Sequence, residues 1–316
     1  MEASRLRTSG LLLAACVAWP LEASPQPQFT SSEVRDGIYV IHTVIPTPGL
    51  VFQMNNLLVA GSDTVVLVDT LPPPPALYFP LSGLIHSLTN GRPVDTLVNT
   101  SWHFDHVGLN DRFRLLDGTG TILGHWRTAE YLVEQRCNID TGMCTGPFPP
   151  ESYPTIGVKG HKELVLPSEV INLKTVENAH SGADLFVYLE RANVMYTGDV
   201  YFGGMYPVID RSGGGTVNGM LHALHQVLAR IDDGTVVVPS HGPIGNRQSV
   251  LEFADMLQTV RAQVRELIAR GFSEAEVMSD PSFADLDARW GNGFIPGAMF
   301  RRMVYRDLES QRPAQE

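Results

Sequence analysis

Residues 99–106 read Asn99-Thr100-Ser101-Trp102-His103-Phe104-Asp105-His106, and this stretch is the most informative part of the sequence for the fold. Three potential metal ligands, His103, Asp105 and His106, stand within four residues of one another. They cannot share one face of a helix, where neighbours are three and four residues apart, so the spacing favours a loop that leaves a strand. The apolar Leu97-Val98 supplies that strand, and residues 107–110 can open a helix.

Further candidate ligands stand next to other apolar runs. His180 precedes a run at 185–189, Asp199 follows one at 194–196, and His241 follows Val236-Val237-Val238-Pro239-Ser240. Side chains from strand ends that are distant in sequence are how α/β proteins assemble sites. Imidazole and carboxylate ligands without a thiolate favour zinc, with iron and manganese as alternatives.

The rest of the chain is typical of a mixed α and β protein. Short β-rich runs bounded by turn residues predict strands at 38–43, 50–60, 64–69, 95–99, 185–189, 193–196 and 235–238. Helices are predicted after the four prolines at 72–75, to about Leu88, and over 217–228, where the apolar residues share one helical face. Two similar halves suggest two sheets stacked face to face with helices outside.

The C-terminal part is predicted to be helical. Apolar residues recur at helical spacing from Ser249 to Arg270, Gly271 follows as a capping glycine, and Ser273 with Glu276 forms a capping-box pattern. We expect residues 247–316 to form an extension packed on a main domain at 30–246. The Gly- and Pro-rich segment 141–160 is predicted to be a loop, either a lid or a surface excursion.

Residues 1–24 are typical of a secretory signal. Basic residues at positions 5 and 7 precede an apolar stretch at 10–21 that is too short to span a bilayer. Residues 13–16 (Leu-Ala-Ala-Cys) resemble a bacterial lipobox, so a periplasmic or extracellular protein and a lipid-anchored one both stay open. No later segment reaches transmembrane length.

The cysteines and the net charge indicate which compartment and which binding partners suit the protein. In an oxidising compartment Cys137 and Cys144 are expected to form a disulfide worth about 2.5 kcal/mol, with two free thiols as the alternative. A net charge of −11 argues against nucleic acid, which binds clustered Lys and Arg. A small-molecule substrate is therefore expected.

The ordered set of candidate ligands resembles the metallo-β-lactamase superfamily, which is marked by His-x-His-x-Asp-His, then a lone His, a Gly-Asp and a final His. The matching stretches are 99–106, Ala179-His180-Ser181-Gly182-Ala183-Asp184, Tyr196-Thr197-Gly198-Asp199 and Pro239-Ser240-His241-Gly242. Val66-Leu67-Val68-Asp69-Thr70 looks like the family's strand before its first helix. The resemblance implies a four-layer αββα sandwich with a two-metal zinc site.

One position departs from the family motif, because Ser101 stands where the family has its first His. By resemblance, the first metal would keep only His103 and His180, whereas the second would take Asp105, His106 and His241, with Asp199 bridging the two. A neutral hydroxyl is a poorer zinc ligand than imidazole. We therefore expect one tight zinc at the second site and a first site that is weak, water-completed or empty.

The resemblance implies an exported hydrolase of a small ester, lactone, thioester or β-lactam, in which metal hydroxide attacks a carbonyl and Asp105 orients the water and carries its proton. The β-lactamase alternative is weakened by Asp199, where recognised β-lactamases usually carry Cys or Ser. A non-catalytic zinc- or ligand-binding descendant is the competing class. Structural roles are expected for Asp69, which could bond the metal loop, and for His42, His86, His125, His161, His222 and His225.

Overall fold

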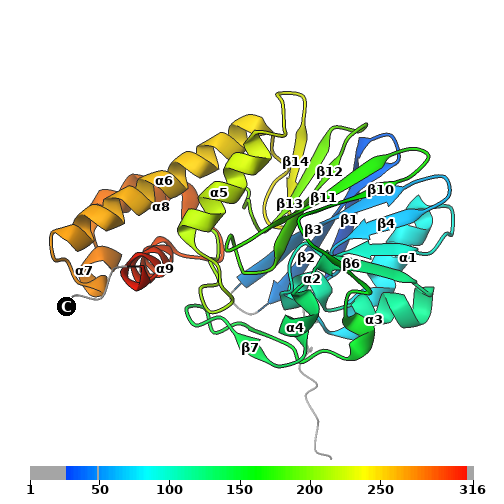
Figure 1. The fold of residues 1–316 in the computed structure, drawn as a ribbon, viewed down its shortest axis with the longest axis horizontal. Coiled ribbons are helices and arrows are strands. Elements are labelled where there is room, and N and C mark those ends of the chain that lie inside the picture. Colours follow the sequence, from blue (N-terminus) through cyan, green and yellow to red (C-terminus); the bar gives the residue numbers. More distant parts are fainter. Residues whose placement is uncertain (1–25, 48–49, 312–316) are drawn as a thin grey trace, which may run out of the picture.

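Two β-sheets form the centre of the molecule in the computed structural model, which describes residues 26–47 and 50–311 (Figure 1). In order across the first sheet, its strands are β1 (Gln28–Arg35), β2 (Ile38–Thr47), β3 (Leu50–Ala60), β4 (Val65–Val68), β5 (Thr96–Val98), β6 (Thr121–His125) and β9 (Ile156–Val158). The second sheet contains β10 (His161–Val165), β11 (Val170–Val176), β12 (Asp184–Leu189), β13 (Val194–Gly198) and β14 (Val236–Pro239). A separate hairpin pairs β7 (Arg136–Cys137) with β8 (Cys144–Thr145).

Helices connect the strands and follow them. Between the strands lie η1 (Pro75–Leu77), α1 (Tyr78–Leu88), α2 (Phe104–Val107), α3 (Asn110–Arg112), the π-helix η2 (Phe113–Asp117), α4 (Thr128–Leu132), η3 (Pro150–Ser152) and α5 (Val217–Leu228). After the last strand come α6 (Arg247–Ala269), α7 (Glu274–Met278), η4 (Pro281–Phe283), α8 (Ala284–Trp290) and α9 (Gly297–Ser310).

Alternation of side chains along the strands separates the cores. In β4, Val66 and Val68 join the cluster between the two sheets, whereas Val65 and Leu67 join the cluster beneath α1. Because successive side chains of a strand point to opposite faces, an apolar strand such as β4 is buried on both sides. The predicted α/β sandwich with helices outside is confirmed, with α1 covering one sheet and α5 covering the other (Figure 1).

The C-terminal helices continue the core of the second sheet. Val260 and Val264 of α6 and Phe300 and Val304 of α9 share one buried cluster with the apolar face of α5. Asn246 caps α6 through a capping box, Gly271 takes φ +86° after the helix, and the Ser273–Glu276 box opens α7. The predicted helices therefore form, and they pack on α5 rather than standing apart.

Two sequence expectations are wrong in detail. The segment 141–160 is not structureless: it contains β8, η3 and β9, and β9 pairs in parallel with β6 at the edge of the first sheet. The ligand motif was expected to lie in a loop, but α2 begins at Phe104, so Asp105 and His106 lie in a helical turn. The helix expected to open at 107–110 does form, because α3 begins at Asn110.

Two expectations concern the surroundings of the protein. The predicted disulfide between Cys137 and Cys144 is formed and closes the β7–β8 hairpin. The predicted signal sequence at 1–24 and the lipobox-like residues 13–16 lie outside the described residues. Within 26–47 and 50–311, no helix is long and apolar enough to cross a membrane.

Candidate metal centre

The candidate ligands meet because strand ends of both sheets lie at one edge of the sandwich. In the second sheet β13 runs parallel to β14 and antiparallel to β12, so the carboxyl ends of β13 and β14 lie beside the start of β12. Asp199, His241 and His180 stand at those three ends. The backbone N–H of Leu185 donates to the carbonyl of Thr100 (2.8 Å), which ties the motif after β5 to the second sheet.

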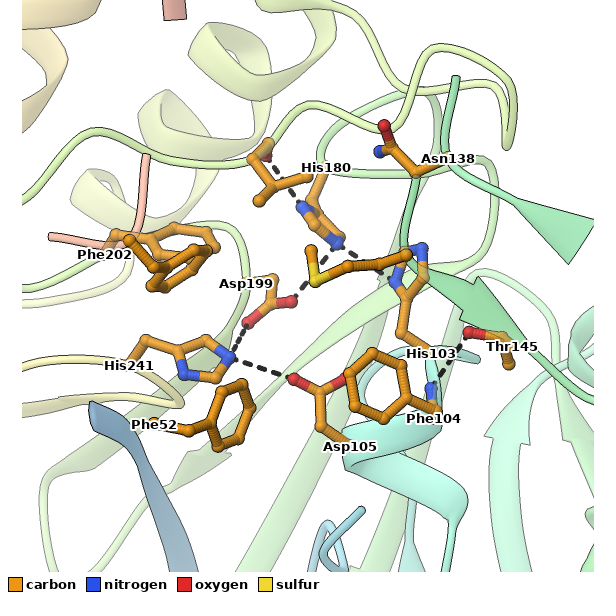
Figure 2. Close-up of a pocket in the computed structure, with 13 residues that line it drawn as sticks. Phe52, His103, Phe104, Asp105, Asn138, Thr145, His180, Asp199, Phe202 and His241 are labelled. Atoms are coloured by element: carbon orange, nitrogen blue, oxygen red, sulfur yellow. Dashed lines mark hydrogen bonds and ion pairs between the residues drawn. The ribbon is translucent and has the colours of Figure 1, made fainter. Parts of the chain in front are cut away.

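The six predicted ligands form two groups of three, and Figure 2 shows five of them, all except His106. In the first group, Nε2 of His180 lies 3.0 Å from Nδ1 of His103 and 3.2 Å from Oδ2 of Asp199. Within each group the ligand atoms lie within 4.8 Å of one another.

The second group comprises Asp105, His106 and His241. Nε2 of His241 lies 3.2 Å from Oδ2 of Asp105, and Nε2 of His106 lies 3.8 Å from Oδ1 of the same carboxylate. Asp199 also reaches this group, because its Oδ2 lies 3.1 Å from Nε2 of His106 and its Oδ1 lies 3.6 Å from Nε2 of His241. Asp199 therefore stands between the two groups.

The outer nitrogen of every ring is held by an acceptor. Nδ1 of His180 donates to the carbonyl of Val208 (2.9 Å), and Nδ1 of His241 donates to the carbonyl of Gln53 (2.8 Å). Nδ1 of His106 bonds Oδ2 of Asp69 (2.8 Å), and Nε2 of His103 bonds Oδ2 of Asp210 (2.8 Å). Partners of this kind fix the tautomer of metal-binding histidines.

This arrangement fits a bound cation. With a proton on each outer nitrogen, the inner nitrogen of a neutral ring presents a lone pair to the centre, where Asp105 and Asp199 present carboxylate oxygens. Acceptors that face acceptors in a buried space are satisfied by protons or by a metal ion. Two imidazoles and one carboxylate in each group, without sulfur, suit zinc.

Charges at the centre are strongly coupled. Burial alone would raise the pKa of Asp199, but His106, His180 and His241 lower it well below its usual value. Burial alone would lower the pKa of His106, but the carboxylates of Asp69, Asp199 and Asp105 raise it well above its usual value. Asp199 thus remains ionised and favours positive charge at the centre.

An apolar pocket opens over the two groups (Figure 2). Besides ligands of both groups, its lining consists of Phe52, Phe104, Asn138, Met143, Thr145, Phe202, Val208 and Phe294. The pocket encloses about 430 Å³, including the part open to solvent, which is the size of a small-molecule site.

Comparison with known families agrees with the ligand pattern. A sequence model described as the metallo-β-lactamase superfamily matches residues 49–241, which is more than half of the chain. The chain belongs to the metallo-β-lactamase superfamily. The comparison with curated proteins gave no match.

Solved metallo-β-lactamases share the fold at low sequence identity. One from Pontibacter korlensis is 18% identical with a TM-score of 0.58, and the match covers 73% of this chain and 99% of that one. The metallo-β-lactamase IND-7 is 18% identical with a TM-score of 0.57 (72% and 98% covered), and DIM-1 exposed to ceftazidime is 18% identical with a TM-score of 0.58 (74% and 99% covered). At these identities the likeness establishes the fold alone.

Ser101 marks this member of the superfamily. It is 1% exposed, and its hydroxyl lies 2.9 Å from Nδ1 of His103, the nitrogen that faces His180. The Ser101 hydroxyl can therefore donate to the lone pair that a metal in the first group would need. Serine at this position therefore removes one imidazole ligand of the family motif, and its hydroxyl competes with a metal ion for Nδ1 of His103.

Two carboxylates outside the superfamily motif hold its histidines. Asp69 takes φ +61° after β4 and accepts from the backbone N–H of Thr100 (2.7 Å) as well as bonding His106, so its expected bond to the metal loop is confirmed. Asp210 was missed by the sequence reasoning. Its Oδ1 accepts from the hydroxyl of Ser212 and from the backbone N–H of Gly213, the first of three consecutive glycines at 213–215. The turn that contains these residues therefore directs the carboxylate toward His103.

The remaining histidines do not join the centre. In the part of the chain that the structure describes, neither metal-competent group includes His42, His86, His125, His161, His222 or His225. His42 bonds the side chain of Asn55, and His161 bonds that of Asn172. The pair on α5, His222 and His225, finds no third ligand among the described residues.

Proposed function

We propose that this protein is a zinc-dependent hydrolase of a small ester, lactone, thioester or β-lactam. The observation that carries the proposal is the orientation of the four histidines. Each ring has its outer nitrogen on an acceptor and its inner nitrogen toward Asp105 or Asp199, at the floor of a pocket of small-molecule size. A binding site of this construction beside a substrate-sized space supports chemistry more strongly than a purely structural metal.

Zinc held by the first group (His103, His180 and Asp199) or by the second (Asp105, His106 and His241) would polarise a carbonyl and lower the pKa of water to about 7. Asp105 lines the pocket, and its Oδ2 lies 3.2 Å from Nε2 of His241, so its carboxylate is placed to orient a water molecule and accept its proton. The phenylalanines around the ligands exclude bulk water, which strengthens charge interactions at the reacting carbonyl.

We further propose that zinc binds the two groups unequally. Asp105, His106 and His241 keep every ligand that the superfamily motif supplies, whereas the first group has lost one to Ser101. Metal analysis after dialysis against dilute chelator should find one retained equivalent. Two equivalents retained with similar affinity would overturn the asymmetry.

The hydrolase proposal is tested with lactams, lactones, thioesters and aryl esters assayed in the presence of zinc. Asp105→Asn should lower turnover about a hundredfold or more, because the proton acceptor is lost. Asp255→Asn, at an exposed position of α6, is the matched control and should retain activity. Circular dichroism should show that both variants keep the fold; an Asp105→Asn enzyme that is as active as the control would overturn the role of Asp105.

The competing function is a non-catalytic binder, and Ser101 is the observation that favours it, since its hydroxyl occupies the lone pair of His103. This alternative predicts a native protein that binds zinc but turns over no member of the acyl panel. Turnover that depends on Asp105 excludes it.

We also propose that the protein is exported to the periplasm or the extracellular space. A disulfide between Cys137 and Cys144 is compatible with an oxidising compartment. Fractionation of cells that produce the full chain should recover it outside the cytoplasm. Replacement of Cys16 by Ser separates the two anchoring alternatives, because only a lipid-anchored protein would lose membrane association.

A further inference from the structure

We infer that the pocket takes an uncharged substrate with an apolar acyl group, such as an alkyl or aryl ester or lactone, in preference to one that carries a carboxylate. This inference rests on the proposed hydrolase function and names the substrate class of that site. It follows from the aromatic frame, from the charges of the lining, and from the origin of one wall in the C-terminal helices.

Three phenylalanines surround the ring of one ligand. The ring centroids of Phe52, Phe202 and Phe294 lie 5.4, 5.5 and 5.5 Å from that of His241. The ring centroid of Phe294 is also 6.1 Å from that of Phe202. These rings come from β3, from the segment after β13 and from the segment between α8 and α9. The three phenylalanines therefore come together only when both sheets and the C-terminal helices are folded.

Charged side chains of the lining are confined to the ligands themselves. Among the described residues that line the pocket there is no Lys or Arg. With one zinc bound, the carboxylates of Asp105 and Asp199 would offset the charge of the metal, so a substrate carboxylate away from the reacting carbonyl would enter an apolar space with no cationic side chain to pair with it. Burial of an unpaired charge is strongly unfavourable, whereas an alkyl or aryl group gains from the same surface.

Three arginines converge on Asp140, which lies two residues after the pocket residue Asn138. Arg211 bonds Oδ2 of Asp140 (3.0 Å), Arg306 bonds Oδ1 (3.0 Å), and Arg302 donates to its carbonyl (2.8 Å). Asp140 lies in the turn of the β7–β8 hairpin, and its side chain is fully buried. These contacts pin the hairpin to α9 and hold the guanidinium groups of Arg211 and Arg306 on carboxylates outside the pocket lining.

A neutral hydrogen-bond donor completes the pocket. The amide oxygen of Asn138 accepts from the backbone N–H groups of Asp140 (2.9 Å) and Thr141 (3.0 Å), which leaves its Nδ2 at the pocket wall. This nitrogen is buried and has no hydrogen-bond partner in the described residues. A carbonyl or ring oxygen of an ester or lactone would satisfy it without bringing charge.

The test compares two esters of equal length, 4-nitrophenyl pentanoate and the monoanionic 4-nitrophenyl hydrogen glutarate. The native zinc-loaded protein should prefer the pentanoate at least tenfold in kcat/KM, and unbranched esters from acetate upward should gain about threefold per methylene until the pocket is filled. Equal or better hydrolysis of the glutarate would overturn the inference while the hydrolase proposal stood.

Substitutions of Phe294 test whether its wall of the pocket determines the preference for the uncharged ester. Phe294→Arg should reduce the preference for pentanoate at least tenfold, whereas Phe79→Arg, on an exposed side chain of α1, should leave it unchanged. An unaltered preference in a folded Phe294→Arg protein would contradict the assignment of this wall. The comparison in the native protein holds even if this variant does not fold.

A binding measurement is independent of turnover. The uncharged fluorophore N-phenyl-1-naphthylamine should bind native protein with or without zinc, and Phe294→Ala should raise its Kd about tenfold while Phe79→Ala does not. Loss of binding in Phe294→Ala, together with no hydrolysis of any lactam, lactone, thioester or ester of the panel by the native protein, would support the apolar pocket and refute the hydrolase. Equal binding by the native protein and Phe294→Ala would refute the pocket inference.

Discussion

Replacement of Asp210 by Asn should selectively weaken zinc binding in the first group. Oδ2 of Asp210 bonds Nε2 of His103, while Oδ1 accepts from Ser212 (2.7 Å) and from the backbone N–H of Gly213 (2.9 Å). The Gly213 N–H can only donate, so the amide oxygen of Asn must face it. The amide NH₂ then faces Nε2 of His103 and forces the proton of that ring onto Nδ1, the nitrogen required by the metal.

The expected size of the effect follows from the same geometry. Loss of a carboxylate partner behind a metal-binding His typically lowers affinity 10- to 100-fold, which is about 1.4 to 2.7 kcal/mol. Asp210 is 1% exposed, so water does not readily replace the lost acceptor. Trp102 stacks on His103 with centroids 4.2 Å apart and holds the ring in place, so the effect should be electronic rather than a displacement.

Competition with a chromophoric zinc chelator can resolve two stepwise constants. In Asp210→Asn the weaker constant should fall 10- to 100-fold and the tighter one should change less than threefold. Asp69→Asn, behind His106, is the matched variant and should reduce the tighter constant instead. Equal losses at both constants in both variants, with melting temperatures near that of the native protein, would refute the assignment of one carboxylate to each group.

Three further substitutions probe other parts of the structure. Ser101→His should raise zinc affinity of the first group at least tenfold, and unchanged stoichiometry and affinity in chelator titrations would count against the assignment. Asp140→Asn should raise the KM for neutral esters more than it changes kcat and should lower the free energy of unfolding by about 2 kcal/mol, measured in urea, because the buried partner of Arg211 and Arg306 is lost. Burial and Arg127 lower the pKa of His125 to about 4. His125 therefore binds a proton near pH 6.5 in the unfolded chain but only near pH 4 in the folded protein. The free energy of unfolding consequently decreases as the pH falls from about 6.5 to about 4. Between pH 7 and pH 5, the free energy of unfolding measured in urea should therefore fall by about 1 kcal/mol less in His125→Gln than in the native protein. An equal fall in both proteins would refute this prediction.

Local sequence was sufficient for the elements that are buried on both faces. β3, β4, β12, β13 and β14 could be predicted from their apolar sequences, because a strand with little contact with water on either face carries a nearly continuous apolar run. Edge strands such as β1 and β10 escaped prediction, since their sequences, QFTSSEVR and HKELV, carry polar residues on exposed positions. β9 was hidden for a different reason, because only three residues pair with β6.

The candidate ligands could be predicted because their residue types and order are themselves a pattern, and the structure brings all six together. Their supports could not. Asp210 reaches His103 across 107 positions of sequence, and Phe294 reaches the pocket from a segment that the helical pattern marks only as a connection. Contacts of this kind depend on the packing of the whole C-terminal part on α5, which no local spacing encodes.

The aromatic frame and the loss of a motif histidine concern different groups. Phe52, Phe202 and Phe294 enclose His241, a ligand of the second group, whereas Ser101 stands beside His103 of the first. Oδ2 of Asp105, the proposed proton acceptor, lies 3.2 Å from Nε2 of His241, the ligand that the phenylalanines enclose. Substrate binding and proton transfer can therefore both proceed at the group with the full set of ligands, and a weak first site is compatible with an active enzyme.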